Sequence, residues 1–247
     1  MEVKSIDINS DVGEGFGNEK QLFPLISSCN IACGGHAGDE TSILQVALLA
    51  QKYKVKVGAH PSYPDKKGFG RVDIKISNTK LKNSIEKQVN TFQKVIETNA
   101  IKMHHIKPHG ALYNGIAKDV TLAHVFLDAI GNYKDETILY VPYDSIIARE
   151  ATKQGFKIWY EAFCDRNYNK DLTLVSRKKP DSLITRPEEV LEHLLPIINN
   201  GSVKTVSGTI SHIKADTFCI HGDTPTAMEI LMYLTEELPK HHIKISK

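Results

Sequence analysis

Short runs rich in β-branched residues alternate along almost the whole chain with longer segments whose apolar residues recur at helical spacing. Strands are expected over residues 5–11, 29–34, 55–60, 103–109, 137–141, 157–161 and 216–221, and amphipathic helices over residues 40–52, 81–98 and 224–238. Strands that alternate with helices indicate repeated βαβ units and a parallel sheet. Seven such units in 247 residues favour a closed α/β barrel. An open doubly wound sheet is the second choice, because one sequence does not reveal strand order.

The segment 165–187 is the least regular stretch and contains the string RKKPDS. We expect a single α/β barrel domain over residues 1–247, with this segment as a long loop after the sixth strand. Loops of that length inside compact domains are typically lids or binding loops. A domain boundary within the segment is the alternative.

The composition is that of an ordinary globular protein, with 41% hydrophobic and 24% charged residues, which argues against collagen-like and disordered chains. The net charge of +2, without a run of five like charges, argues against nucleic-acid binding. No apolar stretch of about 18 residues occurs, and the first residues lack the apolar core of a signal peptide. Four cysteines without a C-x-x-C motif favour a reducing compartment and packed thiols. We therefore expect a cytoplasmic protein that binds neither nucleic acid nor a membrane.

The first expected strand alternates apolar and polar side chains. Asp7, Asn9 and Asp11 share one face, and Ile6 and Ile8 share the other. A barrel interior is usually apolar, and an unpaired buried polar group costs roughly 1–3 kcal/mol. The pattern therefore indicates either a solvated edge strand or the polar face of a functional site.

Histidines and acids recur where four further strands end. The strings CGGHAGDE, GAHPSYPD, KPHGALYN and CIHGDTP supply His36 and Asp39, His60 and Asp65, Lys107 and His109, and His221 and Asp223. In an α/β barrel the carboxyl ends of all strands lie on one rim, where active sites are built. A lone histidine is more often structural, but four at equivalent positions predict a functional cluster on this rim.

Several familiar site motifs are absent. The string DVGEGFG does not open a helix as a dinucleotide fingerprint does, and the chain contains neither a P-loop nor a G-x-S-x-G nucleophile elbow. Histidines and acids at strand ends are donors that a zinc or other divalent site uses. These histidines are dispersed, without an H-E-x-x-H motif, so a metal site stays an open alternative with no ligands assigned.

Six strings, in order over nearly the whole chain, carry a resemblance to a known family. They are NSDVGEGFG (9–17), SCNIACGGHAGD (28–39), GAHPSYPD (58–65) with GFGR (68–71), KPHGALYN (107–114), EAFCDR (161–166) and HGDTP (221–225). In these strings the chain resembles the LamB/YcsF family. Ser10, Gly35, Ser62 and Thr226 depart from the Cys, Phe, Gly and Gly expected there, and the segment after Arg177 lacks an expected glycine.

The resemblance implies a fold and an activity. The fold is a distorted, seven-stranded (β/α) barrel similar to the glycoside hydrolase/deacetylase superfamily. The activity is that of the A subunit of an ATP-dependent 5-oxoprolinase, which cleaves 5-oxo-L-proline to L-glutamate as ATP becomes ADP and phosphate. ATP is then a co-substrate, and the B and C subunits of the enzyme are the partners.

Ring opening of a lactam needs a base for water, cations for developing oxyanion charge and an acid for the ring nitrogen. With the resemblance, the expected catalytic residues are Asp11, His36, His60, Lys107 and His109. The expected substrate-binding residues are Asn9, Glu14, Asp39, Asp65, Arg71, Arg166, His221 and Asp223. The alternatives are a metal-dependent deacetylase acting on an acylated sugar and a non-catalytic ligand-binding subunit.

Overall fold

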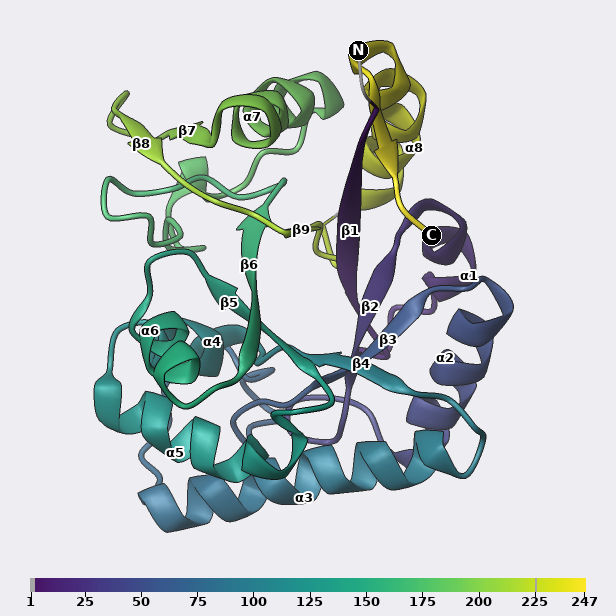
Figure 1. Ribbon diagram of the computed structural model, residues 1–247, viewed down its shortest axis with the longest axis vertical. Coiled ribbons are helices and arrows are strands. Elements are labelled where there is room, and N and C mark those ends of the chain that lie inside the picture. The colour runs from purple at the N-terminus through teal and green to yellow at the C-terminus, as the bar shows by residue number, and fades with distance from the viewer. Residues whose placement is uncertain (1–2, 225) are drawn as a thin grey trace.

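The computed structural model describes residues 3–224 and 226–247, and seven parallel strands at its centre form a closed barrel (Figure 1). In order around the barrel they are β1 (Lys4–Val12), β2 (Ser28–Ala32), β3 (Lys56–His60), β4 (Met103–Ile106), β5 (Ile138–Pro142), β6 (Lys157–Phe163) and β9 (Thr217–Cys219). Because β9 pairs with both β6 and β1, the sheet closes on itself. The predicted seven-stranded barrel is confirmed, and the open doubly wound sheet is excluded.

Helices lie outside the strands (Figure 1). The α-helices are α1 (Glu19–Leu22), α2 (Glu40–Lys52), α3 (Asn78–Glu97), α4 (Gly110–Ile116), α5 (Val120–Ile130), α6 (Ile146–Lys153), α7 (Pro187–Asn200) and α8 (Ala227–Glu237), and short 3-10 turns cover Phe23–Leu25, Gly131–Tyr133, Pro180–Ser182 and Leu238–His241. Helix α2 has the predicted bounds, and α3 begins three residues before the predicted 81 because Ser77 caps it. Pro225, in the predicted helix 224–238 and the last motif, lies outside the described residues. Among the described residues, no helix is both long and apolar enough to cross a membrane.

The barrel is distorted along β1. The first residues of β1 pair with β10 (Ile243–Ile245), whereas residues 7–9 pair with β9. The barrel wall beside β1 is therefore built from two successive short strands near the end of the chain. A separate antiparallel hairpin, β7 (Ser202–Lys204) with β8 (Ile210–His212), lies outside the barrel.

The inward face of β1 is polar and fully paired. Asp7, Asn9 and Asp11 are 4%, 0% and 7% exposed, so the alternative of a solvated edge strand is wrong. Asp7 Oδ1 accepts hydrogen bonds from Ser28 Oγ and Thr217 Oγ1, each at 2.7 Å. Buried polar groups are tolerated when they are hydrogen-bonded. Here the neighbouring strands β2 and β9 supply the hydrogen-bond partners of Asp7.

The β3–β4 pairing carries a bulge that brings a histidine into the barrel. The register shifts between Val57 and Gly58, and His105 lies opposite Gly58. A β-carbon at Gly58 would overlap the His105 imidazole, so only glycine permits this approach. The His105 ring stacks on Tyr140 with ring centroids 4.0 Å apart, and burial holds its pKa well below the usual value.

Candidate active site

A cavity of about 450 Å³ opens at the carboxyl ends of the barrel strands. Acid–base side chains lie at its floor, and basic side chains come from the surrounding loops. The floor includes Asp11, His60, Lys107, His109 and His221, and the basic side chains are those of Arg71, Lys118, Arg166, Arg177 and Lys178. The cavity therefore combines proton-transfer groups with a cationic mouth suited to an anionic ligand.

Lys107 is the cation at the floor of the cavity. Its Nζ lies 3.0 Å from Asp11 Oδ1, 2.8 Å from Glu161 Oε1 and 3.1 Å from Cys219 Sγ. Burial alone lowers the pKa of Lys107, but the carboxylates of Asp11 and Glu161 outweigh burial and hold this pKa well above its usual value. Burial raises the pKa of Asp11, yet His60 and Lys107 outweigh it and keep this pKa low. The floor therefore holds a charged ammonium, that of Lys107, against the ionised carboxylate of Asp11.

Three histidines gather beside this ion pair around the carboxylate of Glu14. The rings of His36 and His109 stack with centroids 3.7 Å apart. His36 Nε2 lies 2.8 Å from Glu14 Oε1, and His109 Nδ1 lies 3.4 Å from the same oxygen. His60 Nε2 lies 2.9 Å from His109 Nδ1 and 3.4 Å from Asp11 Oδ2. Burial lowers the pKa of both His36 and His109, so both imidazoles are neutral at neutral pH. This set of His and Glu donors could hold a divalent metal ion.

His221 also lines the cavity and is held in place by Asp165. The Asp165 carboxylate accepts hydrogen bonds from His221 Nδ1 at 3.0 Å and from Thr224 Oγ1 at 2.7 Å. Burial raises the pKa of Asp165, but the adjacent His221 outweighs it and lowers this pKa. Because Nδ1 is engaged, Nε2 is the nitrogen that His221 has free for a ligand.

The long loop after β6 forms one wall of the cavity. Residues 173–178 line it, which agrees with the interpretation of a binding loop. Arg166 also lines it, but its guanidinium donates to the carbonyl oxygens of Ser182 at 3.1 Å and Val175 at 2.6 Å. Arg166 therefore braces the loop from within, and burial lowers its pKa to about 10.

At the mouth, Arg71 pairs with Asp223 and lies over the ring of Phe69, 4.9 Å from its centroid. Arg177 Nη1 lies 3.7 Å from the same carboxylate. The single negative charge of Asp223 thus positions Arg71 and Arg177 and leaves a net positive charge at the mouth. Arginine is well suited to bind carboxylates and phosphates in two-pronged fashion.

The remaining predicted residues support the site or lie apart from it. Asn9 lies beneath the floor and donates to Glu161 Oε1 at 2.9 Å. Asp65 accepts from Gly68 N at 2.8 Å and so braces the turn that carries Arg71. Asp39 is exposed and caps α2 by accepting from Ser42 N at 2.8 Å. The structure therefore does not bring Asp39 into the cavity.

Replacing Asp39 by Ala is expected to leave turnover within about twofold of wild type, because surface changes away from a site rarely alter it by more. Its melting temperature is expected to fall by a few degrees, roughly the effect of losing a helix cap in a chain of this size. Steady-state kinetics and thermal unfolding check the two parts. A tenfold loss of turnover would place Asp39 in the site after all.

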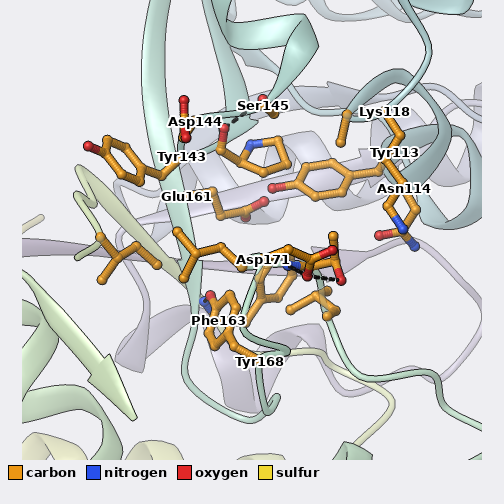
Figure 2. A pocket seen from close by; sticks show the side chains of 16 residues that line it. Tyr113, Asn114, Lys118, Tyr143, Asp144, Ser145, Glu161, Phe163, Tyr168 and Asp171 are labelled. Atoms are coloured by element: carbon orange, nitrogen blue, oxygen red, sulfur yellow. Dashed lines mark hydrogen bonds between the residues drawn. The ribbon is translucent and has the colours of Figure 1, made fainter. Parts of the chain in front are cut away.

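Behind Phe163 lies a second, smaller pocket of about 80 Å³. In Figure 2 the side chain of Tyr113 extends toward Glu161, and both line this pocket. Glu161 Oε2 and the Tyr113 hydroxyl are buried and have no hydrogen-bond partner among the described residues. Glu161 thus pairs with Lys107 through Oε1, while its Oε2 has no hydrogen-bond partner among the described residues.

Sequence reasoning did not assign several residues that the geometry places at the site. They are Glu161, Asp165, Arg177, Tyr113, His105 and Asn30, whose amide donates to Asp11 Oδ1 at 2.9 Å. A signal existed for two of them. Glu161 lies near the end of its strand, as the predicted residues lie near the ends of theirs, and His105 precedes Lys107 by two residues and so shares its strand face.

Fold and site together define a seven-stranded parallel α/β-barrel protein with a lysine–carboxylate and histidine site at the carboxyl ends of its strands. The model of the LamB/YcsF family matches residues 6–247, and the chain belongs to this family, as its motifs predicted. The A subunit of a 5-oxoprolinase from Thermococcus sibiricus is 40% identical over 246 residues, covering 97% of this chain and 96% of that protein. The name of that relative denotes one component of a multi-subunit enzyme.

Solved structures give the same picture of the fold. The crystal structure of a lactam utilization protein from Thermus thermophilus is 33% identical, with a TM-score of 0.91, over 98% of this chain and 99% of that one. A family 4 carbohydrate esterase from Streptomyces lividans is 8% identical, with a TM-score of 0.50, over 99% of this chain and 92% of that one. The second likeness shows the fold alone and agrees with the expected deacetylase-type barrel.

Proposed function

We propose that the chain is the A subunit of an ATP-dependent 5-oxoprolinase, which opens the lactam ring of 5-oxo-L-proline to give L-glutamate while ATP is converted to ADP and phosphate. The observation that carries the proposal is the cavity, in which buried acid–base groups lie below a cationic mouth. The similarity to proteins named as the A subunits of 5-oxoprolinases supports the same substrate.

The chemistry of the substrate explains the need for ATP. A five-membered lactam closes again readily, so its hydrolysis alone is poorly driven. Phosphorylation of the lactam oxygen makes the ring carbon electrophilic. A water oxygen then bonds to that carbon, the C–N bond breaks and the nitrogen takes a proton. The resulting acyl phosphate loses phosphate to a second water and leaves glutamate.

The cavity offers a group for each requirement of this sequence. Asp11, His60 and His109 line the cavity, and in this proposal they take protons from water and give one to the ring nitrogen; His36 adjoins them. The Lys107 ammonium stabilises the oxygen on which negative charge develops. The basic side chains at the mouth hold the carboxylate and the phosphoryl group of the activated substrate.

ATP is proposed to act on the partner chains, the B and C subunits. The sequence contains no P-loop, and phosphoryl transfer needs cations and metal placed around the phosphoryl oxygens. The barrel then receives an activated substrate and completes the ring opening.

The test is glutamate release from 5-oxo-L-proline and ATP by the complex assembled from this chain and its candidate B and C partners. Glutamate and phosphate are expected in equal amounts, and omission of this chain should abolish glutamate release. Glutamate formed at the full rate without this chain would reject its assignment to ring opening.

A metal-dependent deacetylase is the second candidate, favoured by the group of Glu14, His36, His60 and His109. It is separated by incubating the isolated, zinc-loaded chain with an acetylated oligosaccharide and measuring acetate. The alternative of a purely ligand-binding subunit is tested by measuring turnover of the complex with variants of Asp11, His60 and His109. Such a subunit would tolerate the loss of an acid–base group.

A further inference from the structure

Each histidine of the cluster around Glu14 has one ring nitrogen tied to a fixed acceptor. His60 Nδ1 lies 2.7 Å from the carbonyl oxygen of Lys107. His109 Nε2 lies 3.0 Å from the carbonyl oxygen of Phe69. A carbonyl oxygen can only accept, so both of these nitrogens carry hydrogen. In the neutral rings, His60 Nε2 and His109 Nδ1 therefore present lone pairs.

His36 is fixed in the same way through a serine. His36 Nδ1 lies 3.0 Å from Ser62 Oγ, and the Ser62 hydroxyl donates its own hydrogen to the Tyr63 carbonyl at 2.9 Å. Ser62 Oγ must then accept from His36, which leaves a lone pair on His36 Nε2. Gly35 makes room for this contact, because a β-carbon there would overlap Ser62 Oγ.

The three lone-pair nitrogens lie beside the Glu14 carboxylate, which also only accepts. The stacked rings of His36 and His109, with centroids 3.7 Å apart, would turn out of their parallel planes to share one ion. His36 Nε2 lies 2.8 Å from Glu14 Oε1, and His109 Nδ1 lies 2.9 Å from His60 Nε2. The four atoms that could bind a metal, one from each of Glu14, His36, His60 and His109, lie within 4.8 Å of one another. Acceptors at such distances repel unless a cation or a proton lies among them. Tetrahedral bonds of 2.0–2.1 Å would place ligand atoms about 3.3 Å apart, close to these separations.

The charges of the buried carboxylates point the same way. Asp11, Glu14 and Glu161 are buried side chains, and one ammonium, that of Lys107, lies against Asp11 and Glu161. Within residues 3–224 and 226–247, no lysine or arginine pairs with Glu14. A buried carboxylate without a cation is strongly disfavoured. A divalent cation beside Glu14 would neutralise the whole group.

A second set of potential ligands, comprising Asp11, Cys219 and His221, differs in this respect. The Lys107 ammonium already lies 3.0 Å from Asp11 Oδ1 and 3.1 Å from Cys219 Sγ. A metal there would compete with a resident positive charge. The Glu14 set is the one that has room for a cation.

From this geometry we propose that Glu14, His36, His60 and His109 form a binding site for one divalent transition-metal ion, of which zinc fits best. Imidazole nitrogens with one carboxylate suit zinc, and the tethered second nitrogens are the usual supports of metal-binding histidines. The site adjoins the cavity through His60 and His109. The inference concerns metal binding by the free chain and does not depend on the identity of the substrate. With the ion bound, His60 and His109 would act as ligands, and the proton transfers proposed above would fall to Asp11.

The test uses the purified full-length chain, stripped with a chelator and dialysed against zinc. Elemental analysis is expected to find about one zinc per chain, and the melting temperature should rise with zinc because the ion binds the folded state. Cobalt in place of zinc should give the intense visible absorption of a four-coordinate ion. These readouts need no substrate, so they separate failure of the metal site from failure of the proposed reaction.

Variants assign the ligands. Glu14→Gln and His109→Gln are each expected to weaken zinc binding at least about 100-fold, and Ser62→Ala about 10- to 100-fold, the range seen for supporting groups. His193→Gln is the matched control: His193 Nε2 lies 3.2 Å from the Phe163 carbonyl, but His193 belongs to neither potential ligand set. Circular dichroism shows whether each variant folds, and the cobalt spectrum of the wild-type chain is decisive where one does not. Less than about one-tenth of a zinc per wild-type chain, a cobalt spectrum typical of a six-coordinate aqueous ion, or unchanged affinity in the folded ligand variants would overturn the proposal in favour of a shared proton.

Discussion

The isolated chain is expected to release no glutamate from 5-oxo-L-proline and ATP, and to hydrolyse ATP no faster than the buffer does. The physical reason is the division of the reaction. Ring opening by the acid–base groups of the cavity requires an activated lactam, and activation requires a nucleotide site for which the sequence carries no P-loop. Both activities should appear together when the B and C partners are added.

The measurement is a coupled assay of glutamate and phosphate, run on this chain, on the partners and on the complete mixture. The partners without this chain should form no glutamate, even where they consume ATP. ATP hydrolysis by this chain alone that depends on 5-oxo-L-proline would overturn the prediction and would locate a nucleotide site in its loops.

Replacing Asp11 by Asn is expected to lower turnover of the assembled complex at least about 100-fold, the usual scale for an acid–base group. Asp11 lies at the floor of the cavity, and its carboxylate faces both Lys107 and His60. An amide of the same shape can neither take up a proton nor balance the ammonium. Replacing His60 or His109 by Ala should have an effect of similar size, because each lines the same floor.

The matched control is Asp39→Asn, the same chemical change at the exposed cap of α2, which should leave turnover nearly unchanged. Circular dichroism and analytical gel filtration of the complex show that the variants fold and assemble. If Asp11→Asn and both histidine variants turn over at nearly the wild-type rate, the floor of the cavity has no part in catalysis.

The strands were predictable because each is a short buried run bounded by polar or glycine-rich segments. The polar face of β1 was also legible, since the alternation of Asp7, Asn9 and Asp11 with isoleucines is a local pattern. The sequence alone could not predict which polar side chains contact one another inside the barrel. Lys107 and Glu161 are far apart in sequence, and their 2.8 Å contact depends on the width of the closed barrel.

Side-chain direction in the loops was equally beyond the sequence. Arg166 follows a strand end as the floor residues do, yet its guanidinium turns toward the carbonyls of its own loop. Asp39 stands three residues from His36, but it is the N-cap of α2, and its carboxylate caps that helix instead of entering the cavity. A motif therefore indicated the region of the site, while local hydrogen bonds decided how each side chain is used: Asp39 stays outside the cavity, and Arg166 lines it but binds its own loop.

The pairing of β1 with β9 and β10 also determines at which stage of folding the site can form. The first strand of the barrel finds two of its neighbours only among residues 217–219 and 243–245, so its closure depends on contacts between opposite ends of the chain. Such long-range pairing slows folding, because the entropy of closing a very large loop is lost before the contacts form. During synthesis β1 leaves the ribosome before β9 and β10, so the strand that carries Asp11 is enclosed only after residues 217–219 and 243–245 have followed it. During that interval an unpaired β1 edge is exposed, which makes the nascent chain, rather than the finished barrel, the form most prone to aggregate.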